Sequence, residues 1–186
     1  MTIPNILTIL RIVLTPVIVW KICSGGTGAA FWLFLVAAAT DGLDGFIARR
    51  FNCRSRLGEI LDPLADKLLM VGAGVVLLRL KLLPAWLFLL IMLRELLILG
   101  GAAGYRALTG RLEIEPAVLS KANTLLLLLL ILSLLGIRSG LILGGFWIEV
   151  LTLAVGASTL ASGVYYVVVW GRRAARATTM PKGHNR

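Results

Sequence analysis

Residues 41–66 read DGLDGFIARRFNCRSRLGEILDPLAD, and this stretch decides both the fold and the chemistry that the chain can support. Its four aspartates, Asp41, Asp44, Asp62 and Asp66, lie between segments that are apolar enough to enter a membrane. A carboxylate at the centre of a bilayer costs about 2.5–3.5 kcal/mol even on the mildest insertion scale. The four acids therefore predict a neutralising partner, and a divalent cation is the simplest one.

The composition of the whole chain is that of a membrane protein. It has 186 residues, of which 59% are hydrophobic, and its mean hydropathy is +0.93. Several apolar runs reach the length of about 20 residues that crosses a bilayer as a helix. We therefore expect an all-α integral membrane protein with six transmembrane helices. Residues 1–173 would form a single domain, and residues 174–186 a basic, flexible tail.

The apolar runs also give the approximate bounds of the helices. We expect them over residues 6–22, 29–49, 57–78, 84–106, 118–135 and 146–170. A short interfacial turn or helix is expected at Pro4–Asn5, before the first span. Gly25–Gly26 would end the first helix, and Pro84 would begin the fourth, where its missing N–H is harmless.

The net charge of +10 could indicate nucleic acid as a partner, but the basic residues follow the loops instead. They gather after the second and fourth expected helices and near both ends of the chain, at Arg11, Arg49, Arg50, Arg54, Arg56, Arg106, Arg111, Lys121, Arg172, Arg173, Arg176, Lys182 and Arg186. Cytoplasmic loops carry such an excess, and it also attracts anionic membrane lipids. We therefore expect both termini and the acidic stretch on the cytoplasmic side, with no nucleic acid bound.

Helical spacing arranges the acids in rows. Residues three and four apart share a face of a helix, so Asp41 and Asp44 lie on adjacent rows of one helix. Asp62 and Asp66 form a row on the next helix, and the short connection favours antiparallel neighbours whose rows face one cleft. Carboxylate oxygens suit Mg²⁺, Mn²⁺ or Ca²⁺, and two such ions clamp a phosphoryl centre.

The residues between the acids suit a phosphate-bearing ligand. Gly45, Ala48 and Gly58 are small and leave room for a ligand or for close backbone approach. Arg49 can donate two parallel hydrogen bonds to a phosphate, and an acid that is less committed to metal is free to act as a general base. A salt bridge between helices would explain one buried aspartate equally well, but it explains four at this spacing poorly.

The same residues match a known signature. The chain resembles the CDP-alcohol phosphotransferases, whose signature is D-x2-D-G-x2-A-R-x8-G-x3-D-x3-D. Its fixed positions are filled with the correct spacing by Asp41, Asp44, Gly45, Ala48, Arg49, Gly58, Asp62 and Asp66. The opening IPNILTILRIVLTP is similar to the bacterial phospholipid-synthesising branch, so the resemblance extends over the chain and implies a bacterial cytoplasmic membrane.

The resemblance implies a homodimer with a six-helix membrane fold that uses two Mg²⁺ or Mn²⁺ ions. Carried over by position, the metal ligands would be Asp41, Asp44, Asp62 and Asp66. The cytidine diphosphate of the donor, CDP-diacylglycerol, would lie beside Gly45, Ala48, Arg49 and Gly58. Asp66 would also deprotonate the acceptor hydroxyl, which would attack the lipid-linked phosphorus while CMP leaves.

The second half of the chain looks more like the cardiolipin synthases of the CDP-alcohol type, which use phosphatidylglycerol as acceptor. This likeness rests on the pieces around Arg94–Glu95, Tyr105–Arg106, Ser120–Thr124 and Tyr165–Arg172. The nearest rival is phosphatidylglycerophosphate synthase, which uses glycerol 3-phosphate and would have a Gly-Lys-x-Lys-Thr-like run at residues 120–124. The chain has SKANT there, and the missing second lysine favours the singly charged phosphodiester of phosphatidylglycerol.

Both acceptors are anionic and need basic residues, for which Arg94, Lys121 and Arg106 are the candidates. Arg94 is an embedded charge that is expected to face the bundle interior, either as a ligand or in a salt bridge with a neighbouring acid. Lys121 lies at a helix start, where a cation is unfavourable to the dipole, which favours a ligand role over a surface anchor. Arg106 is explained equally well as an anchor.

Two functions without catalysis are the alternatives. A divalent-cation transporter would line its path with acids, but these acids cluster near one interface together with Arg49. A membrane scaffold packed through small residues such as Gly100, Gly101 and Gly104 would leave the four aspartates unexplained.

Overall fold

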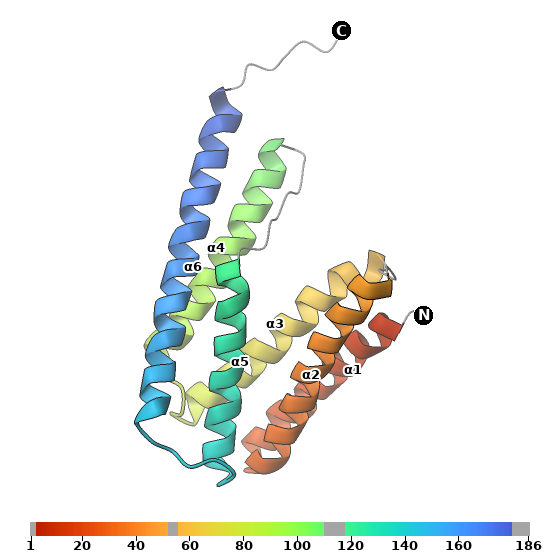
Figure 1. Ribbon diagram of the computed structural model, residues 1–186, viewed down its shortest axis with the longest axis vertical. Coiled ribbons are helices and arrows are strands. Elements are labelled where there is room, and N and C mark those ends of the chain that lie inside the picture. Colours follow the sequence, from red (N-terminus) through yellow and green to blue (C-terminus); the bar gives the residue numbers. More distant parts are fainter. Residues whose placement is uncertain (1–2, 52–55, 110–117, 180–186) are drawn as a thin grey trace. The chain divides into compact units, whose positions relative to one another are not determined.

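The computed structural model describes the backbone of residues 3–51, 56–109 and 118–179, and the side chains of residues 8–40, 42, 61, 64–101, 104 and 119–170. Within these ranges the chain forms six helices and no strand, which confirms the all-α prediction (Figure 1). The helices are α1 (Ile3–Cys23), α2 (Thr27–Phe51), α3 (Arg56–Arg79), α4 (Ala85–Thr109), α5 (Val118–Arg138) and α6 (Phe146–Thr179).

Two of the described helical segments are long and apolar enough, by length and composition, to cross a membrane. They are Leu119–Arg138, with a mean hydropathy of 1.9, and Phe146–Trp170, with 1.5. Thr27–Thr40 in α2 is a shorter apolar helix. The apolar character that we expected is therefore present in the folded helices, whereas the number of spans stays a prediction.

The ends of α1 show one difference from the prediction and one agreement. Because α1 begins at Ile3, Pro4 and Asn5 belong to its first turn and not to a separate interfacial helix. Proline is tolerated there, since the first N–H groups of a helix have no partner within it. At the other end Gly25 has a φ of 82°, and the N–H of Gly26 donates to the carbonyl of Lys21 at 2.9 Å. This left-handed glycine ends the helix as predicted.

The chain groups into two compact units. Unit 1 comprises Met1–Ala85 and Leu128–Ile148, and unit 2 comprises Trp86–Leu127 and Glu149–Arg186. Helix α5 contributes its first half to unit 2 and its second half to unit 1. The single domain predicted over residues 1–173 stays a prediction.

In unit 1, α1 packs against both α2 and α3. The contact with α3 is close at Gly72, where an added Cβ would lie 3.1 Å from Cγ2 of Val19 and 3.6 Å from Cγ2 of Thr15. The fully or almost fully buried apolar side chains of the three helices are Ile18, Ile22, Ala30, Phe34, Ala37, Ala65, Leu69, Ala73 and Leu77. This packing fixes α1 as the common neighbour of the two helices that carry the acidic stretch.

In unit 2, α4 and α6 approach each other through glycines. A Cβ on Gly101 would lie 2.7 Å from the ring of Trp170, and a Cβ on Gly156 would lie 3.0 Å from the ring of Trp86. By contrast, nothing lies within 4 Å of a Cβ added to Gly100 or Gly104. Of the three glycines that the scaffold alternative invoked, Gly101 alone packs tightly against a described side chain.

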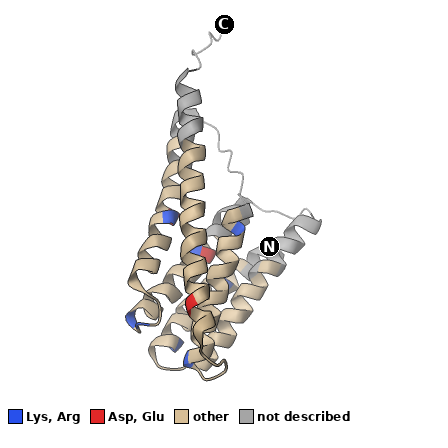
Figure 2. Ribbon diagram, turned by 60° about the vertical axis from the view of Figure 1, so that its left-hand side comes forward, with Lys and Arg blue, Asp and Glu red and all other residues tan. Residues whose placement is uncertain are grey.

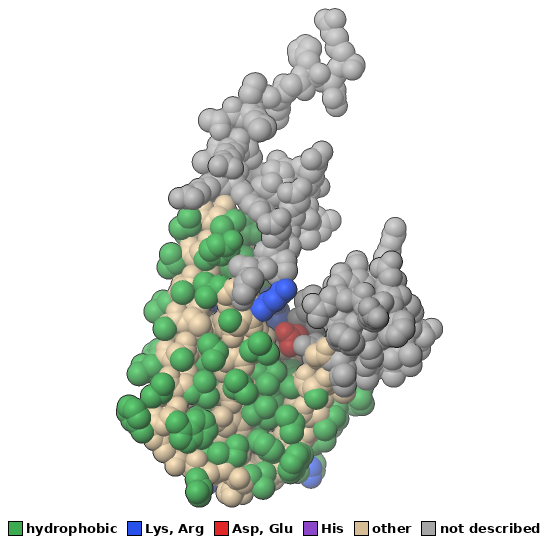
Figure 3. Space-filling view, viewed as in Figure 1, with side chains coloured by type: hydrophobic (Ala, Val, Ile, Leu, Met, Phe, Trp, Pro, Cys, Tyr) green, Lys and Arg blue, Asp and Glu red, His purple; other side chains and the backbone are tan. Residues whose placement is uncertain are grey.

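The distribution of side chains is inverted relative to a soluble protein. Large apolar side chains are exposed along the described helices, and they cover much of the face shown in Figure 3. Charged side chains are sparse among the described residues (Figure 2). The buried polar and charged residues are Thr8, Arg11, Thr15, Thr27, Arg94, Asn123, Thr159 and Ser162. Soluble monomers rarely expose large contiguous apolar patches, so this surface suits contact with lipid.

Candidate active site

The signature residues fall on two helices of unit 1. Asp41, Asp44, Gly45, Ala48 and Arg49 lie in α2, and Gly58, Asp62 and Asp66 lie in α3. Apart from Asp66, the side chains of these residues lie outside the described ones. The convergence of the four carboxylates, and the placement of the donor-binding residues around a ligand, therefore stay predictions.

The backbone nevertheless places acids of the two helices at matching distances from their connection. Asp41 lies ten residues before Phe51, the last residue of α2, and Asp66 lies ten residues after Arg56, the first residue of α3. At a rise of about 1.5 Å per residue, each is about 15 Å from the connection along its own helix. Both helices also pack against α1, so the acids belong to neighbouring parts of one unit.

Asp66 is the one signature acid whose side chain is described. It is partly exposed and takes part in a non-covalent interaction. The turn that carries it is anchored on both sides, because Ala65 is fully buried and Leu69 is 2% exposed. A general base has to lie within hydrogen-bond reach of the proton that it removes, so the role of Asp66 as the base stays a prediction.

The donor set fits a pair of hard dications, since Mg²⁺ and Mn²⁺ prefer carboxylate oxygens. Among the side chains that the structure describes, no group of three His, Cys, Asp or Glu residues could hold a metal ion. Asp41, Asp44 and Asp62 fall outside that part of the chain. The fit therefore rests on the donor chemistry and on the matching positions along α2 and α3.

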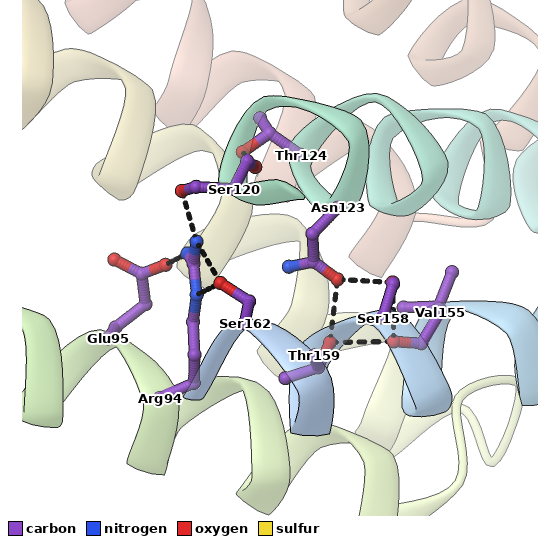
Figure 4. A network of polar contacts seen from close by, with 9 residues as sticks. All are labelled: Arg94, Glu95, Ser120, Asn123, Thr124, Val155, Ser158, Thr159 and Ser162. Atoms are coloured by element: carbon purple, nitrogen blue, oxygen red, sulfur yellow. Dashed lines mark hydrogen bonds and ion pairs between the residues drawn. The ribbon is translucent and has the colours of Figure 1, made fainter. Parts of the chain in front are cut away.

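Unit 2 holds Arg94 in a network of polar contacts (Figure 4). The residue is 6% exposed, so it faces the interior as predicted. Its guanidinium forms an ion pair with Glu95, donates to the hydroxyl of Ser120, and donates to Oγ of Ser162 from Nε at 3.4 Å and from Nη2 at 3.2 Å. Of the two roles considered for Arg94, the structure shows the salt bridge with a neighbouring acid, whereas its role in binding the acceptor stays a prediction. The network joins α4, α5 and α6.

Asn123 forms a second polar contact between α5 and α6. Its side chain is 2% exposed, and its Oδ1 accepts hydrogen bonds from Ser158 at 2.6 Å and from Thr159 at 2.8 Å (Figure 4). In the sequence, Asn123 stands where the branch that uses glycerol 3-phosphate would have the second lysine of its Gly-Lys-x-Lys-Thr-like run. Its role in packing was not predicted, although a lone amide within an apolar run is a signal for a contact between helices.

The structure says less about Lys121 and Arg106, the other two candidates for binding the acceptor. Lys121 is exposed in the first turn of α5, which agrees with a ligand role and with an anchor alike. Arg106 lies in α4, and its side chain is outside the described residues.

A pocket of about 220 Å³ lies beside Arg94, between α4 and α6. Its lining is leucine, valine and glycine apart from Arg94 and Thr159. Small-molecule pockets usually measure about 300–1,000 Å³, so this pocket is small, and its lining is almost entirely apolar.

Arg11, which was counted with the basic residues near the N-terminus, is buried in the structure. The residue is 1% exposed, and all three guanidinium nitrogens are buried. It lies between buried Thr8 and Thr15 on α1. A count of basic residues by position along the chain cannot detect this burial, but the spacing of three and four residues along one face could have indicated it.

Comparison with known proteins gives the family. The sequence model for CDP-alcohol phosphatidyltransferase matches residues 1–170. The chain therefore belongs to the CDP-alcohol phosphatidyltransferase family, which confirms the resemblance derived from the acidic stretch and decides for an enzyme over a transporter or a scaffold.

The relatives divide between two acceptor specificities. The chain is 39% identical over 140 residues to a probable cardiolipin synthase (CMP-forming) of Drosophila melanogaster, covering 67% of this chain and 44% of the relative. It is 34% identical over 183 residues to the human cardiolipin synthase (CMP-forming), covering 89% and 60%. It is 33% identical over 184 residues to the chloroplastic CDP-diacylglycerol–glycerol-3-phosphate 3-phosphatidyltransferase 1 of rice, covering 89% and 56%. The chain thus spans about half the length of the curated relatives that it matches.

Proposed function

We propose that this chain is a metal-dependent phosphatidyltransferase that moves the phosphatidyl group of CDP-diacylglycerol to a hydroxyl of phosphatidylglycerol, giving cardiolipin and CMP. The observation that carries the proposal is the complete acidic signature on α2 and α3, two helices that share α1 as a neighbour. The family match over residues 1–170 supports it.

The proposed setting is a bacterial cytoplasmic membrane, with the six helices as spans and the protein as a homodimer. The exposed apolar side chains support the membrane location. The basic residues after α2 and α4 and near the ends of the chain support an orientation with both termini and the reaction centre in the cytoplasm.

In the reaction, Asp66 acts as the general base. It removes the proton of the acceptor hydroxyl, whose oxygen forms a bond to the phosphorus that carries diacylglycerol. The bond from that phosphorus to the oxygen of CMP breaks, and CMP leaves with the electron pair. General-base catalysis of this kind contributes about 10²–10⁴-fold to the rate.

The remaining signature residues bind and orient the donor. Asp41, Asp44, Asp62 and Asp66 would hold two Mg²⁺ or Mn²⁺ ions, which, when bound, neutralise charge on the diphosphate. Arg49 would donate hydrogen bonds to a phosphate of the donor. The small side chains of Gly45, Ala48 and Gly58 would let the cytidine diphosphate approach the helices closely.

Two features of unit 2 support a lipid as the acceptor. Asn123 stands where the branch that uses glycerol 3-phosphate would have its second lysine, and its amide oxygen is already used by Ser158 and Thr159. This leaves Lys121 and Arg106 as the basic residues for a singly charged phosphodiester, with Arg94 joining them if the acceptor displaces its contact with Glu95. The apolar pocket suits an acyl chain; the donor has such chains in both reactions, but the pocket lies beside Arg94, an acceptor candidate, so we assign it to a chain of phosphatidylglycerol.

One assay tests the reaction and the acceptor together. The purified protein receives CDP-diacylglycerol with Mg²⁺ or Mn²⁺, and phosphatidylglycerol and glycerol 3-phosphate in parallel reactions, and the product lipids are identified by mass. We expect cardiolipin and CMP, and no turnover when the metal is chelated. Product from glycerol 3-phosphate alone would overturn the choice of acceptor, and absence of CMP from every reaction would overturn the function.

Glycerol 3-phosphate is the second candidate acceptor. The specific observation in its favour is the rice relative, which is 33% identical over 89% of this chain and is named for glycerol 3-phosphate. The chemistry of the reaction centre would be the same, so the parallel assay decides between the two acceptors.

A further inference from the structure

We propose that Arg11 is a positioning residue of the reaction centre: its buried guanidinium offsets the charge of the signature aspartates and holds the Asp66 carboxylate in place. This inference rests on the proposed function of those acids. It assigns a role to a residue of α1, outside the signature.

The burial of Arg11 calls for groups that offset its charge. The residue is 1% exposed, with Nε and both Nη atoms buried. Charged side chains inside membrane helices pair with other charges or with backbone carbonyls, because an isolated charge there is costly. Because α1 itself carries no acid, a carboxylate partner would come from helices that pack against α1, which include α2 and α3.

The sequence limits which carboxylates can serve. All those of unit 1 lie within the acidic stretch, at Asp41, Asp44, Glu59, Asp62 and Asp66. Unit 1 therefore offers Arg11 no carboxylate outside the signature region.

The contact between α1 and α3 brings Arg11 to the level of Asp66. The two helices run in the same direction (Figure 1), and Gly72 of α3 lies against Thr15 of α1. Arg11 lies four residues before Thr15 on α1, and Leu68 lies four residues before Gly72 on α3, so Arg11 is level with Leu68. Because side chains in helices lean toward the N-terminus, the long arginine side chain extends about one turn further back, toward Ala65 and Asp66.

The buried face of α1 changes polarity along its length. It is polar at Thr8, Arg11 and Thr15 and apolar at Ile18 and Ile22. On α3 the signature aspartates precede buried Leu69, Ala73 and Leu77 in the sequence, and the side chain of Asp66 is partly exposed. Arg11 therefore lies in the polar part of the buried face of α1, where its charge can act on the acids of unit 1.

The proposal predicts competition between Arg11 and dications for the same carboxylates. The full chain in nanodiscs of phosphatidylcholine is titrated with Mn²⁺ in the absence of nucleotide, and free Mn²⁺ is followed by electron paramagnetic resonance. In Arg11→Met, which keeps an apolar stem, we expect Mn²⁺ to bind on the order of tenfold more tightly, because a like charge has been removed. Arg11→Lys keeps the charge and should bind Mn²⁺ within about twofold of wild type. Arg79→Met, an exposed arginine at the far end of α3, is the matched control and should behave as wild type.

Thermal unfolding and kinetics complete the test. With metal chelated, Arg11→Met should unfold at a lower temperature than wild type, and Arg11→Met/Asp66→Asn should recover part of the loss, because a cation and an anion are removed together. If Arg11→Met alone does not fold, recovery of folding in this double variant shows whether Arg11 and Asp66 offset each other's charge. With CDP-diacylglycerol, kcat of Arg11→Met should fall by about tenfold with little change in KM, as expected for a residue that acts through the base.

Three results would overturn the proposal. They are an unchanged Mn²⁺ affinity in a folded Arg11→Met protein, a double variant that is no more stable than Arg11→Met alone, and an increase in KM alone, which would place Arg11 on the donor phosphates. The Mn²⁺ and unfolding measurements need no turnover. A failure of the proposed reaction would therefore appear as absent CMP release in wild type, separate from a failure of the role of Arg11.

Discussion

Each compact unit buries one arginine among its described side chains, and the two arginines differ in where their neutralising groups can come from. Arg94 of unit 2 pairs with Glu95, its neighbour in the sequence, and with the hydroxyls of Ser120 and Ser162. Arg11 of unit 1 has no acid nearby in the sequence, since the nearest one along the chain is Asp41. The charge of Arg94 is thus balanced within its own helix, whereas that of Arg11 depends on other helices.

This difference separates polar groups that hold helices together from polar groups that remain available to a ligand. The contacts of Arg94 in unit 2 are completed by protein groups, and breaking them should mainly lower stability. The acids of unit 1 are more numerous than its buried cation, so they can take up further positive charge. Substitutions in unit 1 should therefore affect catalysis first, and substitutions in unit 2 should affect stability first.

The largest effect is expected for Asp66→Asn in unit 1. Loss of the proposed general base should lower kcat by about 10²–10⁴-fold, while the thermal unfolding temperature stays close to that of wild type. CMP release and thermal unfolding in the same preparation measure both quantities. A normal rate in this variant would show that another group takes the proton.

The matching change in unit 2 is Glu95→Gln. It leaves the buried guanidinium of Arg94 with neutral partners, and we expect a loss of about 1–3 kcal/mol in the free energy of unfolding. Chemical denaturation in detergent micelles measures it, with Arg94→Met/Glu95→Gln as the control that removes both charges. If Glu95→Gln is as stable as wild type, the ion pair contributes nothing and the contrast between the units fails.

A packing change in unit 2 tests the same contrast without charge. Gly101→Ala places a methyl group where a Cβ would lie 2.7 Å from the Trp170 ring, so we expect a destabilisation of about 1–3 kcal/mol from overpacking. Gly100→Ala is the matched control, because nothing lies within 4 Å of its added Cβ. Unfolding curves for the two variants should separate clearly, and identical curves would show that the Trp170 ring moves aside freely.

The smallest effect is expected for Asn123→Ala. The hydroxyls of Ser158 and Thr159 also lie within hydrogen-bonding distance of the carbonyl of Val155, at 3.0 and 2.7 Å, so neither loses its last partner. Hydrogen bonds between membrane helices contribute about 0.6 kcal/mol on average, and we expect a loss of that order by chemical denaturation. A loss several times larger would mean that the amide supports more than one contact.

The sequence allowed the helices to be predicted well, because long apolar runs and the stop at Gly25 are local properties. The family followed from eight spaced residues of the acidic stretch. The end of α6 was less predictable, since the helix extends nine residues beyond Trp170, the predicted end of the span. Membrane thickness limits an apolar span but not a helix, and the residues that follow Trp170 include good helix formers such as arginine and alanine.

The polar interior was predicted less completely. The interior position of Arg94 was predicted, and a salt bridge was one of the two roles considered for it. The burial of Arg11 and the contacts of Asn123 depend on which helix packs against which, and that information is absent from a single helix. The convergence of Asp41, Asp44, Asp62 and Asp66 stays a prediction for the same reason.

The amide of Asn123 has a consequence for how the chain assembles after insertion. It directly precedes Thr124 and the six leucines of residues 125–130, which present nearly identical surfaces at every turn and so permit several sliding arrangements against a neighbour. An oxygen that meets Ser158 and Thr159 in one arrangement alone gives that arrangement an advantage. Even a contribution of about 0.6 kcal/mol corresponds to a nearly threefold preference, so one polar atom can select the alignment that the leucines leave undecided.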